Sequence, residues 1–196
     1  MEALPFYVRQ DDPPAKREIL RAGLKLFAER GLAATSIRDI AERSGYTNPA
    51  LYKHFAGKDE LALHLFETCH ARVWTMCADA LSRAQGFDGK VDAYVACWLE
   101  LTDEYPDVLA FLSDSARTLW PRSSPVLHRK TMIGLARSLV LEAPRVRDGE
   151  VDPDAAAASV QGTLAELGRM IQVGVVQGPA RQWHGRLVAL FSRLVR

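Results

Sequence analysis

The sequence has little cysteine and no long hydrophobic run. Its three cysteines, Cys69, Cys77 and Cys97, are an odd and sparse set that favours reduced thiols over a disulfide framework. No stretch of about 18 consecutive apolar residues occurs, so we expect no membrane-spanning helix and no membrane partner. Residues 1–14 lack the basic flank and the apolar run of a signal peptide. These absences together predict a cytoplasmic protein.

Net charge is also nearly absent, at +1 over 196 residues. Residues 1–60 carry 10 basic against 9 acidic side chains, and the remainder carries 15 against 15. Overall electrostatics therefore neither indicates nor excludes a nucleic-acid partner, and any DNA contact must come from a local arrangement. The hydrophobic fraction of 48% and the charged fraction of 25% are those of an ordinary globular protein.

Motifs of enzyme chemistry are missing as well. The sequence contains no glycine-rich phosphate loop, no nucleophile elbow and no HExxH pattern. His64, Cys69, His70 and Cys77 lie in one predicted helix and extend over too many turns to surround a single metal ion. We therefore expect no enzyme, no metal site and no cofactor.

Helical periodicity and helix-ending residues predict an all-α fold. A first helix opens at Pro13–Pro14 and stops at Gly31, and two short helices follow, separated by Gly45. Residues 1–12 are expected to form a loose arm, and residues 143–149 an exposed loop. The later helices are predicted at 58–83, 91–105, 106–119, 125–142 and 153–177, with a last one after Pro179.

Residues 35–61 carry the pattern of a helix-turn-helix. Such a motif needs a small residue where its two helices meet, a turn residue that tolerates positive φ, and apolar anchors. Ala41 meets the first need and Gly45 the second. Thr35 or Ser36 can cap the first helix, and Thr47 or Asn48 the second. The apolar anchors are Ile37, Ile40, Leu51 and Phe55.

At these fixed offsets residues 16–66 resemble the N-terminal domain of the TetR family of transcriptional regulators. The resemblance rests on Phe27, Ala28, Gly31, Thr35, Ile40, Ala41, Gly45, Leu51, Tyr52, Phe55, Lys58 and Leu61. It covers about a quarter of the chain, and the rest resembles the family only in length and helical character. The resemblance implies an arm (1–14), a three-helix DNA-binding head (15–60), and a helical body for effector binding and dimerisation (61–196).

The resemblance also implies which residues contact double-stranded DNA. Thr47, Asn48 and Lys53 would face bases or nearby phosphates, although Asn48 could instead only cap its helix. Tyr52 and Lys58 would contact phosphates. The full expected set is Thr35, Arg38, Thr47, Asn48, Pro49, Tyr52, Lys53, His54 and Lys58. Two departures from the family pattern are Tyr46, in place of a small aliphatic residue, and Pro49-Ala50.

Aromatic residues are concentrated between residues 66 and 132, where the family resemblance places an effector pocket. Most of these side chains are expected in the helical core. Because small-molecule sites are mainly apolar, some could line a cavity for an uncharged or amphipathic compound. The candidates are Trp74, Trp98, Phe111 and Trp120.

The two C-terminal helices are the expected homodimer interface, which the resemblance places there. Gly162, Gly168 and Gly174 suggest close approach of another helix, because glycine inside a helix costs about 1 kcal/mol relative to alanine, and packing within the chain is the alternative explanation. The expected interface residues are Leu164, Leu167, Ile171, Leu187, Leu190, Phe191 and Leu194. The sequence thus predicts a dimeric repressor of a palindromic operator, released by a small effector. The competing hypothesis is a helical ligand-binding protein whose head no longer binds DNA.

Overall fold

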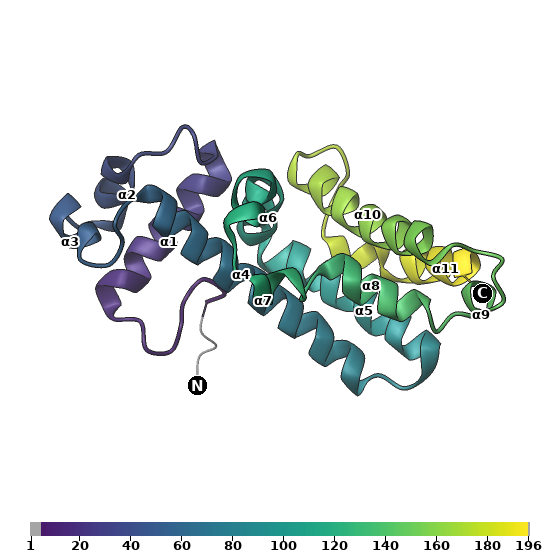
Figure 1. Cartoon of the computed structure of the whole chain (residues 1–196). Helices are drawn as coiled ribbons and strands as arrows, with labels where there is room; N and C mark the ends of the chain where they lie inside the picture. The colour runs from purple at the N-terminus through teal and green to yellow at the C-terminus, as the bar shows by residue number, and fades with distance from the viewer. Residues whose placement is uncertain (1–4, 196) are drawn as a thin grey trace. The chain divides into compact units, whose positions relative to one another are not determined.

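A computed structural model describes residues 5–195, and all regular elements within that range are helical (Figure 1). The all-α prediction is confirmed for these residues. None of the described helices is long and apolar enough to cross a membrane. The elements are α1 (Pro14–Arg30), α2 (Ile37–Ser44), α3 (Asn48–Tyr52), α4 (Lys58–Arg83), α5 (Gly86–Glu104), α6 (Pro106–Leu119), η1 (Trp120–Arg122), α7 (Pro125–His128), α8 (Met132–Val140), α9 (Pro144–Arg147), α10 (Pro153–Gln172), η2 (Ala180–Trp183) and α11 (His184–Val195).

The helices group into two compact units. The head unit contains Met1–Arg72 and Asp107–Leu127, and the body unit contains Val73–Pro106 and His128–Arg196. Helix α4 contributes its first part to the head unit and its last part to the body unit, whereas α6 belongs to the head unit from Asp107 onward. These units are defined by packing. The expected functional boundary after residue 60 stays a prediction.

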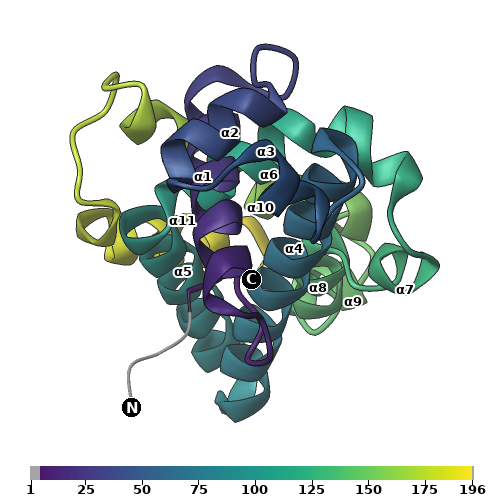
Figure 2. The same cartoon turned by 90° about the vertical axis from the view of Figure 1, so that its left-hand side faces the viewer.

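Two glycines set the helix ends of the head unit where the sequence predicts them. Gly31 has φ 78° and its N–H donates to the carbonyl of Phe27, which ends α1. Gly45 has φ 75° and ends α2. A third glycine, Gly23, allows α1 to approach α4, because a Cβ there would lie 2.7 Å from a methyl group of Leu61. Figure 2 shows the short helices α2 and α3 beside α1.

The segment before α1 is not a loose arm, and that prediction is wrong for residues 5–12. Phe6 and Val8 are buried, because their side chains pack into the head unit. The Arg72 guanidinium in α4 donates to the carbonyls of Pro5 and Val8. The apolar residues here form one short consecutive run, Pro5 to Val8, with no helical or alternating spacing, which is why the sequence did not reveal this packing. Residues 1–4 lie outside the described range.

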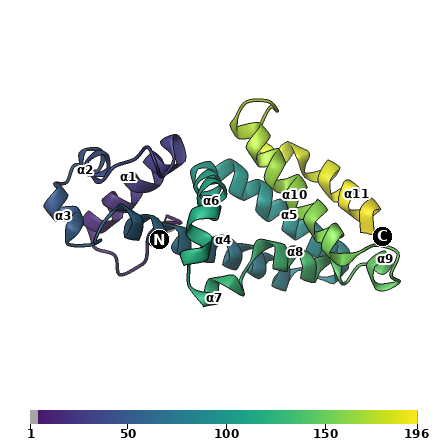
Figure 3. The same cartoon turned by 45° about the horizontal axis from the view of Figure 1, so that its top comes forward.

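The body unit is a bundle in which α5 packs against α11 and α8 against α10 (Figure 3). Tyr94 lies fully buried in α5, and its hydroxyl donates to the side-chain carbonyl of Gln161 in α10 at 2.6 Å. The Asp103 carboxylate, near the end of α5, accepts from the backbone N–H groups of Ala180 and Arg181 in η2. These bonds connect the helices around a shared apolar core.

Three predicted boundaries in the body unit are wrong. The helix expected over 125–142 is split, because the Thr131 hydroxyl accepts from the N–H of Gly134 and starts a new helix, α8. The helix expected to reach residue 177 ends at Gln172, and Gly174 follows with φ 75°. The expected loop at 143–149 contains α9, which is held by buried Val146.

Candidate nucleic-acid interface

The helix-turn-helix is closed by local hydrogen bonds. Ser36 caps α2 reciprocally with Asp39: the Asp39 N–H donates to the Ser36 hydroxyl, and the Ser36 N–H donates to the Asp39 carboxylate at 2.7 Å. The Ser36 hydroxyl, which donates to the Asp39 carboxylate at 2.6 Å, and the Ser36 N–H together lower the pKa of Asp39. After the left-handed Gly45, the N–H of Tyr46 donates to the carbonyl of Ala41. The chain is thereby turned to begin α3, as a helix-turn-helix requires.

Helix α3 is held by its inward side and presents its opposite side to solvent. Leu51 is fully buried and Phe55, just after the helix, is 3% exposed. Pro49 and Lys53 stand two positions either side of Leu51, and two residues rotate a helix by about 200°. They therefore lie on the side opposite the anchor. Thr47 is the N-cap residue and makes no side-chain capping bond, and Asn48 is the first helical residue.

Most of the predicted DNA contacts are exposed side chains on or next to α2 and α3, and we call them the candidate surface. Tyr52 is 56% exposed, and its hydroxyl has no hydrogen-bond partner among the described residues. The side chains at this surface are those of Arg38, Thr47, Asn48, Pro49, Tyr52 and Lys53, all of which are exposed. They offer a cation, amide, hydroxyl and apolar groups, which together suit both phosphates and base edges.

Three predicted contacts are placed differently. Thr35 is 2% exposed, and its hydroxyl donates to the carbonyl of Gly31 at 2.9 Å, so its side chain serves the end of α1. His54 is half-buried. The Lys58 ammonium donates to the carbonyl of Leu32 at 2.7 Å. Because an ammonium has three N–H groups, Lys58 keeps donors for a phosphate.

Ion pairs fix the short helices onto α1 and leave few cations at the surface. Arg43 in α2 holds Glu29 in α1 with two hydrogen bonds of 2.6 and 3.0 Å, and these lower the pKa of Glu29. The Lys16 ammonium lies 5.6 Å from the ring centre of Phe55. Arg38 and Lys53, by contrast, have no ion-pair partner within the described residues. The candidate surface therefore has two uncommitted cations in each chain.

Sequence reasoning found some of the residues that position this surface and missed others. Of its two cap candidates for α2, Ser36 is the N-cap, and its partner Asp39 was missed although aspartate here stands where a capping pattern usually has glutamate. The Arg43–Glu29 pair joins residues on different helices, and no local pattern could reveal it. Half-buried His64, whose ring meets Phe55 edge-on at 5.5 Å, was considered only as a metal ligand. No group suited to a metal ion exists among the described residues.

The four residues predicted for an effector pocket are divided between the two units, and the pair in the head unit, Phe111 and Trp120, shares Phe66 as a neighbour, with ring centres 6.4 and 6.5 Å from it. Trp74 packs under the Lys130 ammonium at 4.8 Å, and Trp98 is buried in α5. In the head unit, Phe111 stacks on Phe27 in the core, and Trp120 lies beside His70 with ring centres 5.3 Å apart. Their role in effector binding stays a prediction.

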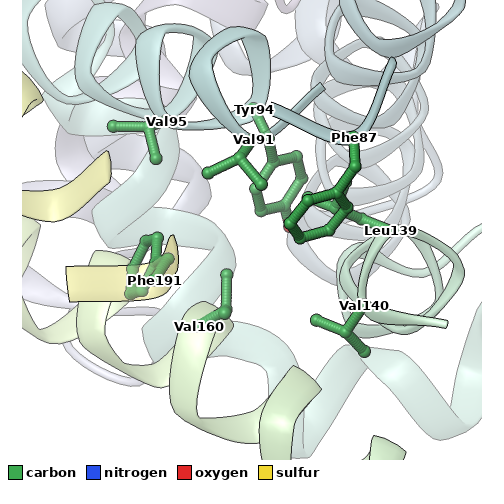
Figure 4. Close-up of a pocket in the computed structure, with 8 residues that line it drawn as sticks. All are labelled: Phe87, Val91, Tyr94, Val95, Leu139, Val140, Val160 and Phe191. Atoms are coloured by element: carbon green, nitrogen blue, oxygen red, sulfur yellow. The ribbon is translucent and has the colours of Figure 1, made fainter. Parts of the chain in front are cut away.

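The body unit contains a small apolar cavity that these four residues do not line (Figure 4). Its volume is about 10 Å³, which is the space of roughly one water molecule. Figure 4 shows its walls, which come from α5, α8, α10 and α11. The lining residues are Phe87, Val91, Tyr94, Val95, Leu139, Val140, Val160 and Phe191.

Burial divides the predicted dimer residues into two sets. Leu164, Leu167, Leu187 and Phe191 are each at most 9% exposed within a single chain, so they belong to its own core. Ile171 and Leu194 are half-buried, and Leu190 is 50% exposed. Gly168 is explained within the chain, because a Cβ there would lie 3.3 Å from the Thr102 hydroxyl. Gly162 faces open space.

Comparison with known proteins decides the family. The pattern described as "Bacterial regulatory proteins, tetR family" matches residues 19–65. The chain is 31% identical to the HTH-type transcriptional repressor Rv3405c of Mycobacterium tuberculosis, over 85% of this chain and 98% of that protein. The chain belongs to the tetR family of bacterial regulatory proteins. It is a DNA-binding transcriptional regulator of this family, and these relatives are regulators rather than enzymes.

Other tetR proteins resemble the chain in part or in fold. TtgR of Pseudomonas putida is 31% identical over 62% of this chain and 53% of its own length. The structure of the ketosteroid regulator KstR2 of M. tuberculosis has a TM-score of 0.79 at 20% identity, covering 96% of this chain and 97% of its own. FadR of Bacillus subtilis, in complex with stearoyl-CoA, has a TM-score of 0.68 at 14% identity, covering 91% and 98%. The last two show the shared fold.

Proposed function

We propose that this tetR protein represses transcription by binding a palindromic operator as a homodimer, and that a small apolar or amphipathic effector releases it. The observation that carries the proposal is the exposed side of α3, which presents Pro49, Tyr52 and Lys53 to solvent while Leu51 anchors the helix. A helix held in this way can enter the major groove. The names of the relatives Rv3405c and KstR2, both repressors, support the direction of regulation.

Dimerisation through α10 and α11 would supply the second head. The exposed side of this helix pair carries Gly162 and Leu190, and a glycine that faces open space permits close approach of a second backbone. Ile171 and Leu194 extend it at half-buried positions. An isologous contact relates two heads by a twofold axis. The twofold axis would make the operator a palindrome, and its half-sites would lie about 34–36 Å apart.

The body unit offers a starting point for effector binding. Its cavity has apolar walls and is lined by Tyr94, whose hydroxyl already binds Gln161. Pockets for drug-sized ligands occupy roughly 300–1,000 Å³, so the helices would have to part for a ligand to enter. FadR of B. subtilis in complex with stearoyl-CoA shows one amphipathic ligand of a protein with this fold. An effector lowers DNA affinity only if it binds the DNA-free conformation more tightly.

A gel-shift titration with the DNA upstream of the chain's own coding region tests DNA binding. We expect a complex that survives a large excess of scrambled duplex, with a protected segment that reads as an inverted repeat. If no complex forms with any duplex, the competing hypothesis holds. If scrambled duplex competes equally well, the head binds DNA without reading its sequence, which contradicts the proposed operator.

Effector control is tested by adding stearate or stearoyl-CoA to that complex. We expect quenching of tryptophan fluorescence, with Trp98 as the reporter one helical turn from Tyr94. Coupling energies of 1–3 kcal/mol would weaken DNA binding about 5- to 150-fold. A compound that quenches at saturation and leaves DNA affinity unchanged shows that the two sites are not coupled.

A further inference from the structure

Phe55 connects α3 to the rest of the head unit. It follows the helix closely, its N–H donates to the carbonyl of Leu51 at 3.0 Å, and its side chain is 3% exposed. Helix α3 has only five residues, and a helix of so few turns is not stable on its own. The orientation of α3 therefore depends on how firmly its two apolar anchors, Leu51 and Phe55, are held.

A charged side chain lies over the Phe55 ring. The Lys16 ammonium, which belongs to α1, is 5.6 Å from the ring centre, within the range of a cation–π contact. The His64 ring of α4 meets the same ring edge-on, with the centres 5.5 Å apart. Phe55 thus contacts side chains of both α1 and α4, and its contact with Lys16 depends on the lysine charge.

Buried Asp12 holds the Lys16 ammonium in place. The ammonium donates to one carboxylate oxygen of Asp12 at 2.7 Å, and the N–H of Arg9 donates to the other at 2.7 Å. Asp12 is 5% exposed, and burial by itself would raise the pKa of its carboxyl, but these two bonds lower that pKa below its ordinary value. Because bonds between charged groups are strong, the pair fixes the position of the cation.

Asp12 lies in the segment that precedes α1, and this segment is fastened at both ends. The Arg72 guanidinium of α4 donates to the carbonyls of Pro5 and Val8. In α1, the Arg17 guanidinium donates to the carbonyl of Asp12 at 2.7 Å. Contacts therefore run from α4 through this segment to Asp12, and from there through the lysine ammonium of α1 to the end of α3.

We propose that Asp12 and Lys16 are positioning residues for sequence recognition, because the cation that Asp12 fixes over the Phe55 ring keeps α3 in the orientation that matches base edges. Neither residue touches DNA in this account, since the Lys16 side chain is 19% exposed and paired, and phosphates would repel Asp12. The inference rests on the proposed DNA-binding function. It adds two residues that precede the helix-turn-helix to those that determine discrimination between sequences.

Loss of positioning has a different signature from loss of folding. Hydrogen bonds to base edges need defined directions, whereas phosphate contacts carry no sequence information and are present on every duplex. A head with a poorly positioned α3 should lose affinity for its cognate duplex and keep its affinity for random DNA. Partial unfolding lowers both affinities by the same factor, because only the folded fraction binds. The ratio of the two affinities therefore separates positioning from stability.

The test measures this ratio in variants that break the Asp12–Lys16 pair from either side. A duplex is first selected by the wild-type protein from a randomised library, and affinities for it and for a scrambled duplex are measured by fluorescence anisotropy. Asp12→Asn and Lys16→Met should each lower the ratio about 2- to 30-fold, which corresponds to the free energies of cation–π contacts. Affinity for the scrambled duplex should stay unchanged. Lys16→Arg keeps the cation and should keep the wild-type ratio.

Lys25→Met is the matched control, because Lys25 is a second lysine of α1 that is paired elsewhere, with Asp107 at 2.9 Å. It should leave the ratio unchanged. In a Phe55→Leu background, Lys16→Met should cause no further loss, since the ring that the cation contacts has been removed. Circular dichroism melting checks that each variant folds, and either variant of the pair decides the question if the other does not fold.

Three results would overturn the inference. The first is a wild-type ratio in both Asp12→Asn and Lys16→Met, and the second is an equal loss of affinity for both duplexes. The third is a fall of the ratio in Lys25→Met or Lys16→Arg as large as that in Lys16→Met. A wild-type protein that selects no sequence contradicts the proposed function itself.

Discussion

The rings of Phe27 in α1 and Phe111 in α6 stack with their centres 5.6 Å apart and an angle of 19° between them. Phe111 is fully buried and also meets Phe66 of α4 edge-on at 6.4 Å. Lys25 and Asp107 add an ion pair of 2.9 Å between the same two helices, α1 and α6. Helix α6 is thus part of the packing that supports the DNA-binding helices, although it follows them by many residues in the chain.

Removing this stack should loosen α1. We predict that Phe111→Ala lowers the free energy of unfolding by about 3–5 kcal/mol, as for other buried phenylalanines. Hydrogen exchange should show lower protection of the α1 amides in the variant. Phe111→Leu keeps most of the side-chain volume. It is the control, and its free energy of unfolding should fall less than that of Phe111→Ala. Unchanged α1 protection in Phe111→Ala would mean that α6 does not support the head.

Thr35 is expected to act within the fold rather than on DNA. Thr35→Val removes the hydroxyl that donates to Gly31 and keeps the shape. We predict a loss of about 1 kcal/mol in unfolding free energy, with the salt dependence of DNA binding unchanged. Calorimetry and anisotropy titrations measure the two quantities. A tenfold fall in DNA affinity at unchanged stability would instead place the hydroxyl at a phosphate.

Substitutions of exposed residues on α10 and α11 test the proposed dimer interface. Gly162→Arg and Leu190→Arg should each give a folded monomer by light scattering at micromolar concentration, with operator affinity greatly reduced. Gly162→Arg should also stabilise isolated α10, because glycine is a poor helix former. Ser138→Arg, at an exposed site on α8, is the matched control and should remain dimeric.

Leu167→Arg provides the contrast, because Leu167 is 9% exposed within its own chain. A charge placed there should lower folding stability first, since an unpaired buried charge is costly. If Gly162→Arg and Leu190→Arg both remain dimers, the interface lies elsewhere on the chain.

His64 should make the head unit less stable in mild acid. The pKa of His64 is lowered to about 4, chiefly by burial and also by the nearby cations Lys16 and Arg9, against the opposing charges of Asp12 and Glu67. The unfolded chain takes up its proton near pH 6.5, whereas the folded chain does so only near pH 4. Unfolding free energy should therefore fall as pH decreases between these values.

The matched variant for this effect is His64→Gln, which cannot titrate. Its unfolding free energy, measured in urea, should fall less than that of the wild type between pH 7 and pH 5. Equal falls in the two proteins would show that other groups, such as the carboxylates, account for the acid sensitivity.

The sequence predicted the head well because its boundaries are local. Gly31 and Gly45 each end a helix with a positive φ that glycine adopts at little cost. Thr35 and Lys58 show the limit, since their partners Gly31 and Leu32 are backbone carbonyls that no side-chain pattern reveals. The predicted dimer interface on α10 and α11 shows a different limit and stays a prediction. Periodicity identifies an apolar side of a helix, but it does not say whether the covering partner is the same chain, as for Leu164, or a second copy.

The central claim is that α3 reads the DNA sequence, and the ratio of affinities for the selected and a scrambled duplex at physiological salt tests it most directly. We predict a wild-type ratio of at least about 10³. If Lys53 binds a guanine with two hydrogen bonds, Lys53→Ala should reduce the difference in binding free energy between the selected and the scrambled duplex by about 1–3 kcal/mol. Tyr52→Phe should weaken binding to both duplexes alike. A wild-type ratio near one, or a ratio that neither Lys53→Ala nor Asn48→Ala changes, would contradict the account.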